Sequence, residues 1–394
     1  MSIRLAHRLL RIRPSATVSI TAKALKLREQ GADIISLSAG EPDFDTPEHV
    51  KAAAVEAIAR GETKYTAVDG STALKEAIVE KFARDNGLDY RPEQIIVSSG
   101  AKQSCYNACQ ALLDAGDEAI IPAPYWVSYP DMVRLADAEP VIVPTSAEQG
   151  FLMSPAQLRA AITKRTKLLI VNSPCNPTGA VYGRDDWIAI GEVLREHPRI
   201  LILADEIYEH ICWHETPFCS LAAACPSIYD RTITINGVSK GYAMSGWRIG
   251  YAAGPEPIIK AMTTIQSQST TNACSISQAA ACAALRGDRG FLQEMCAEFR
   301  ERHAFVIDRL NRIEGVECLP GRGAFYVFPK VQALIDAKGL NDDVALCERL
   351  LETAGVALVP GSAFGARGHL RVAYAASLET LGAALDRIEK FAAS

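Results

Sequence analysis

One stretch decides how the fold of this 394-residue chain is interpreted: Gly237-Val-Ser-Lys240-Gly-Tyr-Ala-Met-Ser-Gly246-Trp-Arg248-Ile-Gly250. It follows an apolar run over residues 233–235, which is typical of a buried strand. A lysine directly after a buried strand loses hydration of its charge, and this is tolerated where the lysine has a use. An isolated lysine in a polar loop is more often an ordinary surface residue. The interpretation of Lys240 therefore depends on the residues around it.

Outward from this stretch, short apolar runs alternate with longer helical patterns. We expect strands over residues 94–98, 118–122, 141–144, 167–171, 200–204, 232–235 and 249–253. Several of them are β-branched and apolar on both faces, which is typical of strands buried between two layers of helices. Helical patterns lie between them, for example over residues 102–114, 187–196 and 256–286. This order predicts an α/β fold in which a mostly parallel sheet lies between helix layers.

The pattern changes after about residue 290. A charged helical pattern over residues 291–314 precedes Gly321-Arg-Gly323-Ala-Phe-Tyr-Val-Phe, a further helix, and strand-like runs over 356–360 and 369–374. We therefore expect a large domain over residues 46–290 and a smaller α+β domain over residues 291–394, as the chain length also suggests. The segment 1–45 ends in the turn-rich Ser38-Ala-Gly40-Glu-Pro-Asp, and we expect it to pack with the small domain.

The composition excludes several classes of protein. Hydrophobic residues make up 48% and charged residues 22%, as in ordinary globular proteins. A net charge of −5 argues against a nucleic acid or an anionic membrane as partner, and no apolar run is long enough to span a bilayer. The eleven cysteines are scattered without a C-x-x-C pair, and His210, Cys212 and His214 match no common zinc spacing. We expect no metal and a cytoplasmic location, with a transit peptide in the basic N-terminus as the alternative.

Polar or aromatic residues follow the ends of the first two predicted strands. In open α/β sheets, ligands bind beyond the carboxyl ends of the strands. Ser99-Gly100-Ala101-Lys102 opens a helix there, and the backbone N–H groups of a helix start favour an anion. Pro124-Tyr125-Trp126 follows the next strand and offers a face for a planar ring. Each motif alone also fits an ordinary helix start or simple packing.

Two later strand ends carry more specific motifs. The turn Asn172-Ser-Pro-Cys-Asn176-Pro-Thr-Gly179 is fixed by two prolines and a glycine, which leaves Asn176 to hydrogen-bond a ring substituent. Asp205 follows five apolar residues and is costly to bury unpaired. It either caps the next helix or pairs with a protonated pyridine nitrogen. Tyr208, three residues later, is placed to reach a phenolate oxygen on the same ring.

Arg371 lies in a strand-like apolar pattern, His369-Leu-Arg-Val-Ala-Tyr374, near the C-terminus. A buried arginine is usually paired, so one interpretation is a structural salt bridge. The other is a bidentate grip on the carboxylate of a substrate.

One ligand accounts for all these sites together: pyridoxal 5′-phosphate. Lys240 would form a Schiff base with its aldehyde, and Asp205 would pair with its ring nitrogen. Asn176 and Tyr208 would bind its phenolate oxygen, while Trp126 stacks on its ring. Its phosphate would be surrounded by Gly100, Ala101, Lys102, Ser239 and Arg248.

The chain resembles the class I (fold type I) aminotransferases along essentially its full length, and most closely the prokaryotic aspartate aminotransferases of the subgroup with Thermus and rhizobial enzymes. Besides the motifs above, the resemblance rests on Pro14-Ser-Ala-Thr-Val, Ala39-Gly40-Glu-Pro-Asp-Phe-Asp-Thr-Pro and Thr63-Lys-Tyr65-Thr. Two positions depart from the subgroup. Cys175 stands where relatives often have asparagine, and Ser239 stands where some have alanine.

The resemblance implies roles for individual residues. Lys240 would be the Schiff-base lysine and would later move a proton between the substrate Cα and the cofactor. Tyr65 would reach the phosphate in the neighbouring subunit, so a homodimer is expected. Arg371 would bind the substrate α-carboxylate in a pocket lined by Gly40, Trp126 and Asn176. The reaction would be a ping-pong exchange between an amino acid and a 2-oxo acid.

The resemblance also suggests the substrates. The loop 266–272 has no arginine that could hold a side-chain carboxylate, whereas Lys102 and Thr17 match positions that the subgroup uses for acidic substrates. We therefore expect transfer from aspartate to 2-oxoglutarate. Arg13 occupies a position that the family associates with prephenate, so the alternative is an aromatic or prephenate aminotransferase with glutamate or aspartate as donor.

Two further alternatives use the same fold differently. A pyridoxal-phosphate lyase or decarboxylase would need the same ring as electron sink, and would differ in which Cα bond stands perpendicular to it. A non-enzymatic regulator would need an additional DNA-binding domain, for which 394 residues leave little room beside the full fold.

Overall fold

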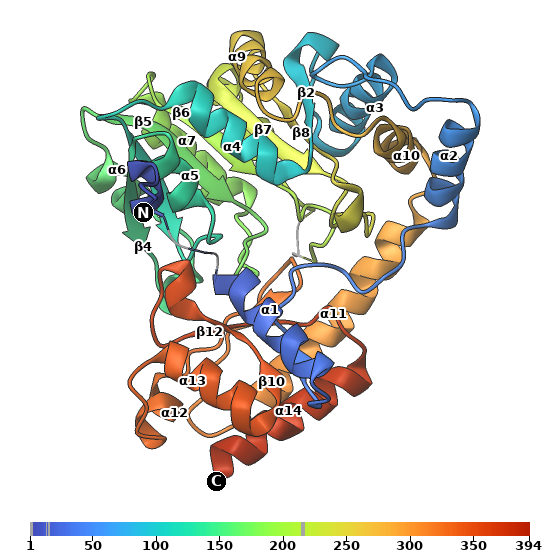
Figure 1. Cartoon of the computed structure of the whole chain (residues 1–394). Coiled ribbons are helices and arrows are strands. Elements are labelled where there is room, and N and C mark those ends of the chain that lie inside the picture. Colours follow the sequence, from blue (N-terminus) through green and yellow to red (C-terminus); the bar gives the residue numbers. More distant parts are fainter. Residues whose placement is uncertain (1–2, 13, 15, 214–216) are drawn as a thin grey trace.

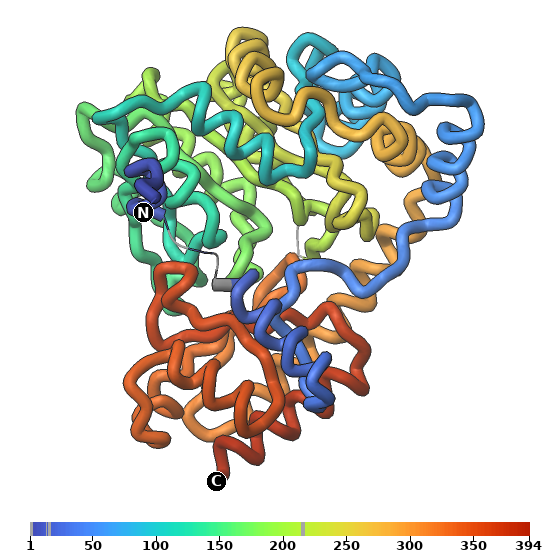
Figure 2. Tube along the Cα trace, in the orientation of Figure 1, coloured from blue at the N-terminus to red at the C-terminus, as the bar shows by residue number. Residues whose placement is uncertain are grey.

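The computed structural model describes residues 3–12, 14, 16–213 and 217–394 (Figure 1). A larger body contains the central sheet, and the first turn of the chain lies against it, where Arg11 forms an ion pair with Asp137. A smaller body contains residues 16–36 and the C-terminal part of the chain, which lie side by side in Figure 2. The segment 1–45, which we expected to pack with the small domain, is therefore divided between the two bodies. None of the described helices is both long and apolar enough to cross a membrane.

The larger body is built on a seven-stranded sheet with the order β2-β8-β7-β6-β5-β3-β4. Only β8 is antiparallel to its neighbours, which confirms the predicted mostly parallel α/β sheet. Each strand lies within two residues of its predicted bounds: β2 (Ile95–Ser98), β3 (Glu118–Ala123), β4 (Glu139–Pro144), β5 (Thr166–Asn172), β6 (Leu201–Asp205), β7 (Thr232–Gly237) and β8 (Gly250–Ala253).

Helices cover both faces of this sheet because alternate strand residues point to opposite sides. Ile170 and Leu203 pack in one apolar cluster with residues of α4, whereas Leu169 and Ile202 pack in another with Trp187 of α7. The helices of the larger body are α2 (Glu48–Ala59), α3 (Thr72–Lys81), α4 (Ala101–Leu112), α5 (Tyr129–Leu135), α6 (Pro155–Ala161), α7 (Arg184–Arg195), α8 (Leu221–Ala224), α9 (Glu256–Ser267) and α10 (Ser275–Arg286).

The single helical pattern expected over residues 256–286 is wrong, because the structure divides it into α9 and α10. The break contains Ser269, Thr270, Thr271 and Asn272, whose side chains compete for backbone hydrogen bonds. Thr271 has a φ of +58°, which no helix accommodates. The apolar spacing on either side gave no sign of this break.

The smaller body contains a three-stranded antiparallel sheet of β9 (Tyr326–Val327), β11 (Val359–Pro360) and β12 (Leu370–Ala373). Strand β1 (Ile35–Ser36) pairs in parallel with β10 (Val356–Ala357), although more than 300 residues separate them. This pairing supports our division of the chain at residues 45 and 290, which remains a proposal. The helices here are α1 (Ala16–Glu29), α11 (Gly290–Leu310), α12 (Gln332–Ala337), α13 (Asp343–Arg349) and α14 (Leu378–Ala393).

Short 3-10 or π segments connect these elements. They are η1 (His7–Leu10), η2 (Phe82–Asn86), η3 (Pro92–Gln94), η4 (Ala147–Gln149), η5 (Pro226–Arg231), η6 (Ser245–Trp247), η7 (Leu350–Ala354) and η8 (Gly361–Phe364). The long helix α11 runs from the larger body into the smaller one (Figure 1).

Candidate active site

A cavity of about 270 Å³ lies beyond the carboxyl ends of β3, β5, β6 and β7, where the two bodies meet. Most of the residues predicted from the sequence line it, although they come from nine separate parts of the chain. They are Thr17, Gly40, Ala101, Lys102, Trp126, Asn176, Asp205, Tyr208, Ser239, Lys240, Arg248 and Arg371. The parallel sheet explains this convergence, because its strands end at one edge.

Lys240 lies in this cavity just after β7, and its Nζ donates a hydrogen bond to the carbonyl oxygen of Gly40 at 2.5 Å. Loss of hydration lowers the pKa of Lys240 to about 8; the nearby Glu41 opposes this shift, and Arg248 adds to it. A lysine with such a pKa has a substantial neutral fraction near physiological pH. Its amine can therefore act as a nucleophile toward an aldehyde.

Asp205 ends β6 and is buried. Its Oδ2 accepts hydrogen bonds from the Tyr129 hydroxyl at 2.6 Å and from the Cys105 thiol at 4.0 Å, and its Oδ1 accepts one from the Ile207 amide at 3.2 Å. Burial raises the pKa of Asp205 to about 6, and the hydrogen bond from Tyr129 opposes this shift. Since no described lysine or arginine forms an ion pair with it, this carboxylate fits a cationic ring nitrogen as its partner.

The start of α4 provides a cradle for an anion. Gly100 caps this helix with a φ of +87°, and a Cβ there would lie 2.4 Å from Nη2 of Arg248. A Cβ on Gly250 would lie 2.0 Å from the amide nitrogen of Ala101. Only glycine permits these approaches. They bring the helix N-terminus and the Arg248 guanidinium together, and Ser239 lines the same cavity; these groups fit a phosphate.

Arg371 lies on β12 of the smaller body and is almost fully buried. Its Nη1 donates to Oδ1 of Asn176 at 3.1 Å, and its Nη2 donates to the carbonyl oxygen of Ser38 at 2.6 Å. No acidic side chain of the described residues pairs with it, and its buried Nε has no partner among them. The described residues therefore do not support the interpretation of Arg371 as part of a structural salt bridge. A ligand carboxylate would give its guanidinium an acidic partner.

Asn172, which the sequence analysis did not assign to the site, holds the turn that carries Asn176. Its Oδ1 accepts a hydrogen bond from the Asn176 amide at 2.9 Å, and its Nδ2 donates to the carbonyl oxygen of Asp205 at 2.9 Å. Asn172 thus connects the end of β5 to the end of β6. Its place directly after a predicted strand was the signal that could have indicated it.

Two tyrosines of the site were also missed. Tyr129 is the first residue of α5, three residues after Trp126, and its hydroxyl donates to Asp205. Tyr326 lies on β9, and its hydroxyl is 2.9 Å from the hydroxyl of Tyr208. Both lie in or close to motifs quoted above, but their partners are 76 and 118 residues away in the chain. Only the tertiary structure reveals such contacts.

One side of the cavity is suited to a second acidic group. The Nζ of Lys102 lies 5.2 Å from the centre of the Trp126 ring. Partial burial, together with the Arg248 guanidinium, lowers the pKa of Lys102. The Oγ1 of Thr17 is buried in the cavity wall and has no hydrogen-bond partner in the described structure. An acidic ligand side chain between them would give both groups a partner.

Two predicted residues that the structure describes, Tyr65 and Gly100, do not line the cavity. Tyr65 is 90% exposed and lies outside the cavity of its own chain. Arg13 is outside the described residues, and the same holds for His214 of the cluster considered above. Gly100 is not part of the cavity wall either, but it lies directly behind Arg248.

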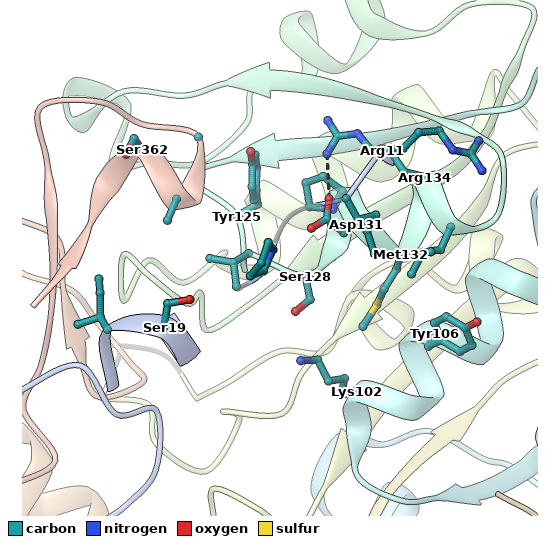
Figure 3. Close-up of a pocket in the computed structure, with 18 of the residues that line it drawn as sticks. Arg11, Ser19, Lys102, Tyr106, Tyr125, Ser128, Asp131, Met132, Arg134 and Ser362 are labelled. Carbon is teal, nitrogen blue, oxygen red and sulfur yellow. Dashed lines mark hydrogen bonds and ion pairs between the residues drawn. The ribbon is translucent and has the colours of Figure 1, made fainter. Parts of the chain in front are cut away.

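A larger, open groove of about 1530 Å³ lies beside the cavity and shares Lys102 and Arg248 with it. Figure 3 shows Ser19, Lys102 and Ser362 around this groove; they belong to α1, α4 and η8. Because the groove is lined by neither Lys240 nor Asp205, the predicted chemistry belongs to the smaller cavity.

Comparisons with known proteins identify the family of the chain. The family model described as aminotransferase class I and II matches residues 32–388. The chain is 50% identical over 392 residues to the aspartate/prephenate aminotransferase of Nitrosomonas europaea, covering 98% of this chain and 99% of that protein.

Solved structures show the same fold. The crystal structure of aspartate aminotransferase from Rhizobium meliloti superposes with a TM-score of 0.94 at 46% identity, covering 100% of this chain and 99% of that one. The structure of aspartate aminotransferase from Thermus thermophilus with maleate gives a TM-score of 0.93 at 46% identity, covering 99% and 100%. These matches confirm the predicted fold type I architecture.

Proposed function

This chain belongs to the aminotransferase class I and II family, whose members in this subgroup use pyridoxal 5′-phosphate, and we propose that it transfers the amino group of aspartate to 2-oxoglutarate. The observation that carries this proposal is the convergence of Lys240, Asp205 and Arg371 in one cavity. When bound, the cofactor supplies a ring that stabilises negative charge developing at the substrate Cα.

The residues of the chain have separate tasks in this proposal. Lys240 binds the cofactor aldehyde through its amine and later moves a proton at the substrate Cα. Asp205 keeps the ring nitrogen protonated, which its lack of a cationic partner supports. Arg371 binds the α-carboxylate. Asn176 and Tyr208 hold the phenolate oxygen, and Trp126 lies against the ring. Ala101, Ser239 and Arg248 hold the phosphate, with Gly100 next to the Arg248 guanidinium.

Lys102 and Thr17 support an acidic substrate. Both line the cavity, and the buried Oγ1 of Thr17 has no hydrogen-bond partner in the described structure. A charge-assisted hydrogen bond contributes roughly 1.5–3 kcal/mol, or about ten- to a hundredfold in affinity. The structure of the Thermus thermophilus relative is described with maleate, which is a dicarboxylate. Lys102 is therefore the residue that we assign to the side-chain carboxylate of aspartate.

Analysis of the products tests this function against the lyase and decarboxylase alternatives. The protein loaded with pyridoxal 5′-phosphate is incubated with aspartate and 2-oxoglutarate. We expect oxaloacetate and glutamate in equal amounts and no release of carbon dioxide. Formation of alanine with carbon dioxide, or of fumarate with ammonia, would assign the cavity to one of those alternatives.

Prephenate as an amino acceptor is the second candidate. Two relatives, from Nitrosomonas europaea and Cereibacter sphaeroides, are named aspartate/prephenate aminotransferase at 50% and 52% identity. Arg13, which lies outside the described residues, is the residue that we associate with this acceptor. If the assignment holds, Arg13→Ala reduces turnover with prephenate much more than turnover with 2-oxoglutarate, and equal losses would contradict it.

We further propose a cytoplasmic homodimer in which Tyr65 reaches the neighbouring cofactor site. The support is that Tyr65 is 90% exposed in the single chain and that nearby α2 exposes the apolar side chains Val55 and Ile58. Apolar groups gathered at one surface favour contact with another protein chain. The scattered cysteines without a C-x-x-C pair support a reducing compartment.

A further inference from the structure

Tyr326 contacts residues on both sides of the active site. It lies on β9 of the smaller body, and its side chain is fully buried. Its hydroxyl lies 2.9 Å from the hydroxyl of Tyr208, which belongs to the larger body. Its ring lies below the guanidinium of Arg371, with 4.6 Å between the guanidinium carbon and the ring centre. It therefore joins a residue assigned to the cofactor with one assigned to the substrate.

The packing around Tyr326 fixes the position of its hydroxyl. A Cβ on Gly40 would lie 2.9 Å from this oxygen, so the backbone at residue 40 closes over it. The rings of Tyr208 and Tyr326 meet edge to face, with centroids 5.8 Å apart. These contacts hold the hydroxyl beside that of Tyr208 in the described structure.

The direction of this hydrogen bond matters for the cofactor. If Tyr326 donates, Tyr208 accepts and keeps its own proton for the phenolate oxygen of the cofactor. Hydrogen bonds arranged in such a chain polarise and strengthen one another. If Tyr208 donated to Tyr326 instead, its proton would be used, and Asn176 alone would remain to donate to the phenolate oxygen.

We propose that Tyr326 is a positioning residue that donates to Tyr208, orienting the Tyr208 hydroxyl toward the cofactor, while its ring supports Arg371 beneath the substrate carboxylate. This inference rests on the proposed function and deepens it. The two tasks belong to different parts of one side chain, the hydroxyl and the ring. They can therefore be separated by substitution.

The variant Tyr326→Phe removes the hydroxyl and keeps the ring. The protein is loaded with pyridoxal 5′-phosphate, and its visible absorption is titrated with pH. Donation from Tyr208 stabilises the negative phenolate of the high-pH form, so weaker donation should raise the midpoint of the colour change. We expect a rise on the order of half a pH unit, together with a KM for aspartate within about twofold of wild type.

The variant Tyr326→Leu removes the ring as well. We expect the same shift of the midpoint and, in addition, a KM for aspartate raised by about tenfold, because the cation–π contact with Arg371 is lost. A matched control is Tyr374→Phe. Tyr374 is buried in the same apolar cluster, but its hydroxyl donates to the carbonyl oxygen of Ala324 at 3.1 Å. This control should change neither quantity.

Two results would overturn the inference. One is a midpoint for Tyr326→Phe equal to that of wild type while Tyr208→Phe moves it. The other is a KM for Tyr326→Phe raised as much as for Tyr326→Leu, which would place the hydroxyl with Arg371 instead of Tyr208. Failure of the proposed function looks different, since wild-type protein itself would then show no visible band or no response to aspartate.

Discussion

Lys240 illustrates how burial prepares a single residue for chemistry. The cavity lowers its pKa from an ordinary 10.5 to about 8, chiefly by removing water from the ammonium group. The neutral amine is the form that attacks an aldehyde, and its fraction grows as the pH rises through the pKa. We therefore expect the rate at which cofactor-free protein binds pyridoxal 5′-phosphate to increase with pH and to level off above about pH 8.

Stopped-flow absorbance measures this rate directly, with free Nα-acetyl-lysine as the control for the ordinary pKa. A rate that continues to rise to about pH 10, as for the free amine, would contradict the assigned environment of Lys240.

Lys102 is the residue that we expect to select acidic substrates. Replacing it in Lys102→Ser removes the only lysine of the cavity wall besides Lys240 among the described residues. The value of kcat/KM for aspartate should fall by about ten- to a hundredfold, whereas that for alanine or phenylalanine should change much less. Steady-state kinetics with the three donors decides this. Equal losses for all donors would assign Lys102 to the cofactor or to the fold.

At the scale of elements, the sequence predicted which residues follow the strand ends, but it did not predict the contacts between different elements. The positions of Asn176, Asp205 and Lys240 follow from one rule, since parallel strands end at one edge of the sheet. The contacts of Tyr129 and Tyr326 do not, because no local pattern specifies a partner on another element. The break between α9 and α10 was missed for a related reason. Its Ser, Thr and Asn side chains interrupt a helix whose apolar spacing is otherwise continuous.

Glu206, the residue directly after β6, is a buried acidic residue that the proposed chemistry does not use. Its Oε1 accepts hydrogen bonds from the Ser220 hydroxyl at 2.8 Å and from the Leu221 amide at 3.0 Å. Burial, with a contribution from nearby Glu209, raises the pKa of Glu206 to about 8. The folded protein therefore keeps this proton where the unfolded chain, with a pKa of 4.5, has released it.

The sign of the resulting pH dependence follows from this difference. A raised carboxyl pKa stabilises the fold fully below pH 4.5, and this contribution is lost as the pH rises toward 8. In Glu206→Gln the amide oxygen can still accept both hydrogen bonds, but it does not titrate. We expect this variant to be more stable than wild type by roughly 1–3 kcal/mol at about pH 8 and to differ little at about pH 4.5.

Thermal unfolding of both loaded proteins at these two pH values measures the effect. Other titrating groups are the same in the two proteins, so the change in their difference isolates Glu206. If the two unfolding temperatures keep a constant difference across this range, Glu206 is already ionised in the fold.

At the scale of the whole molecule, the site is assembled from distant parts. Asp205 and Lys240 come from the larger body, and Arg371 comes from the smaller one. The exposed Tyr65 requires a second copy of the chain in our proposal. The sequence indicated the architecture of each body, since strand and helix patterns are local. It could not show how closely the bodies meet, because that depends on contacts such as those of Gly40 with Tyr326.

Mixing two defective variants tests the shared site. Lys240→Ala lacks the amine, and Tyr65→Ala lacks the hydroxyl that we expect to reach the partner subunit. A mixed dimer would contain one site with both native residues, so unfolding and refolding the variants together should restore up to about a quarter of wild-type activity at limiting pyridoxal 5′-phosphate. A mixture no more active than its separate components would show that Tyr65 does not serve the neighbouring site.

The most direct test of the central claim is the visible absorption spectrum of the purified protein with pyridoxal 5′-phosphate, titrated with aspartate and then with other amino donors. We expect a yellow band that aspartate bleaches at low concentration while a new band appears in the near ultraviolet, and we expect 2-oxoglutarate to restore the yellow band. A yellow band that ignores aspartate but responds to aromatic donors would contradict the proposed substrate. Absence of any yellow band would contradict the assignment of Lys240 and of the cofactor itself.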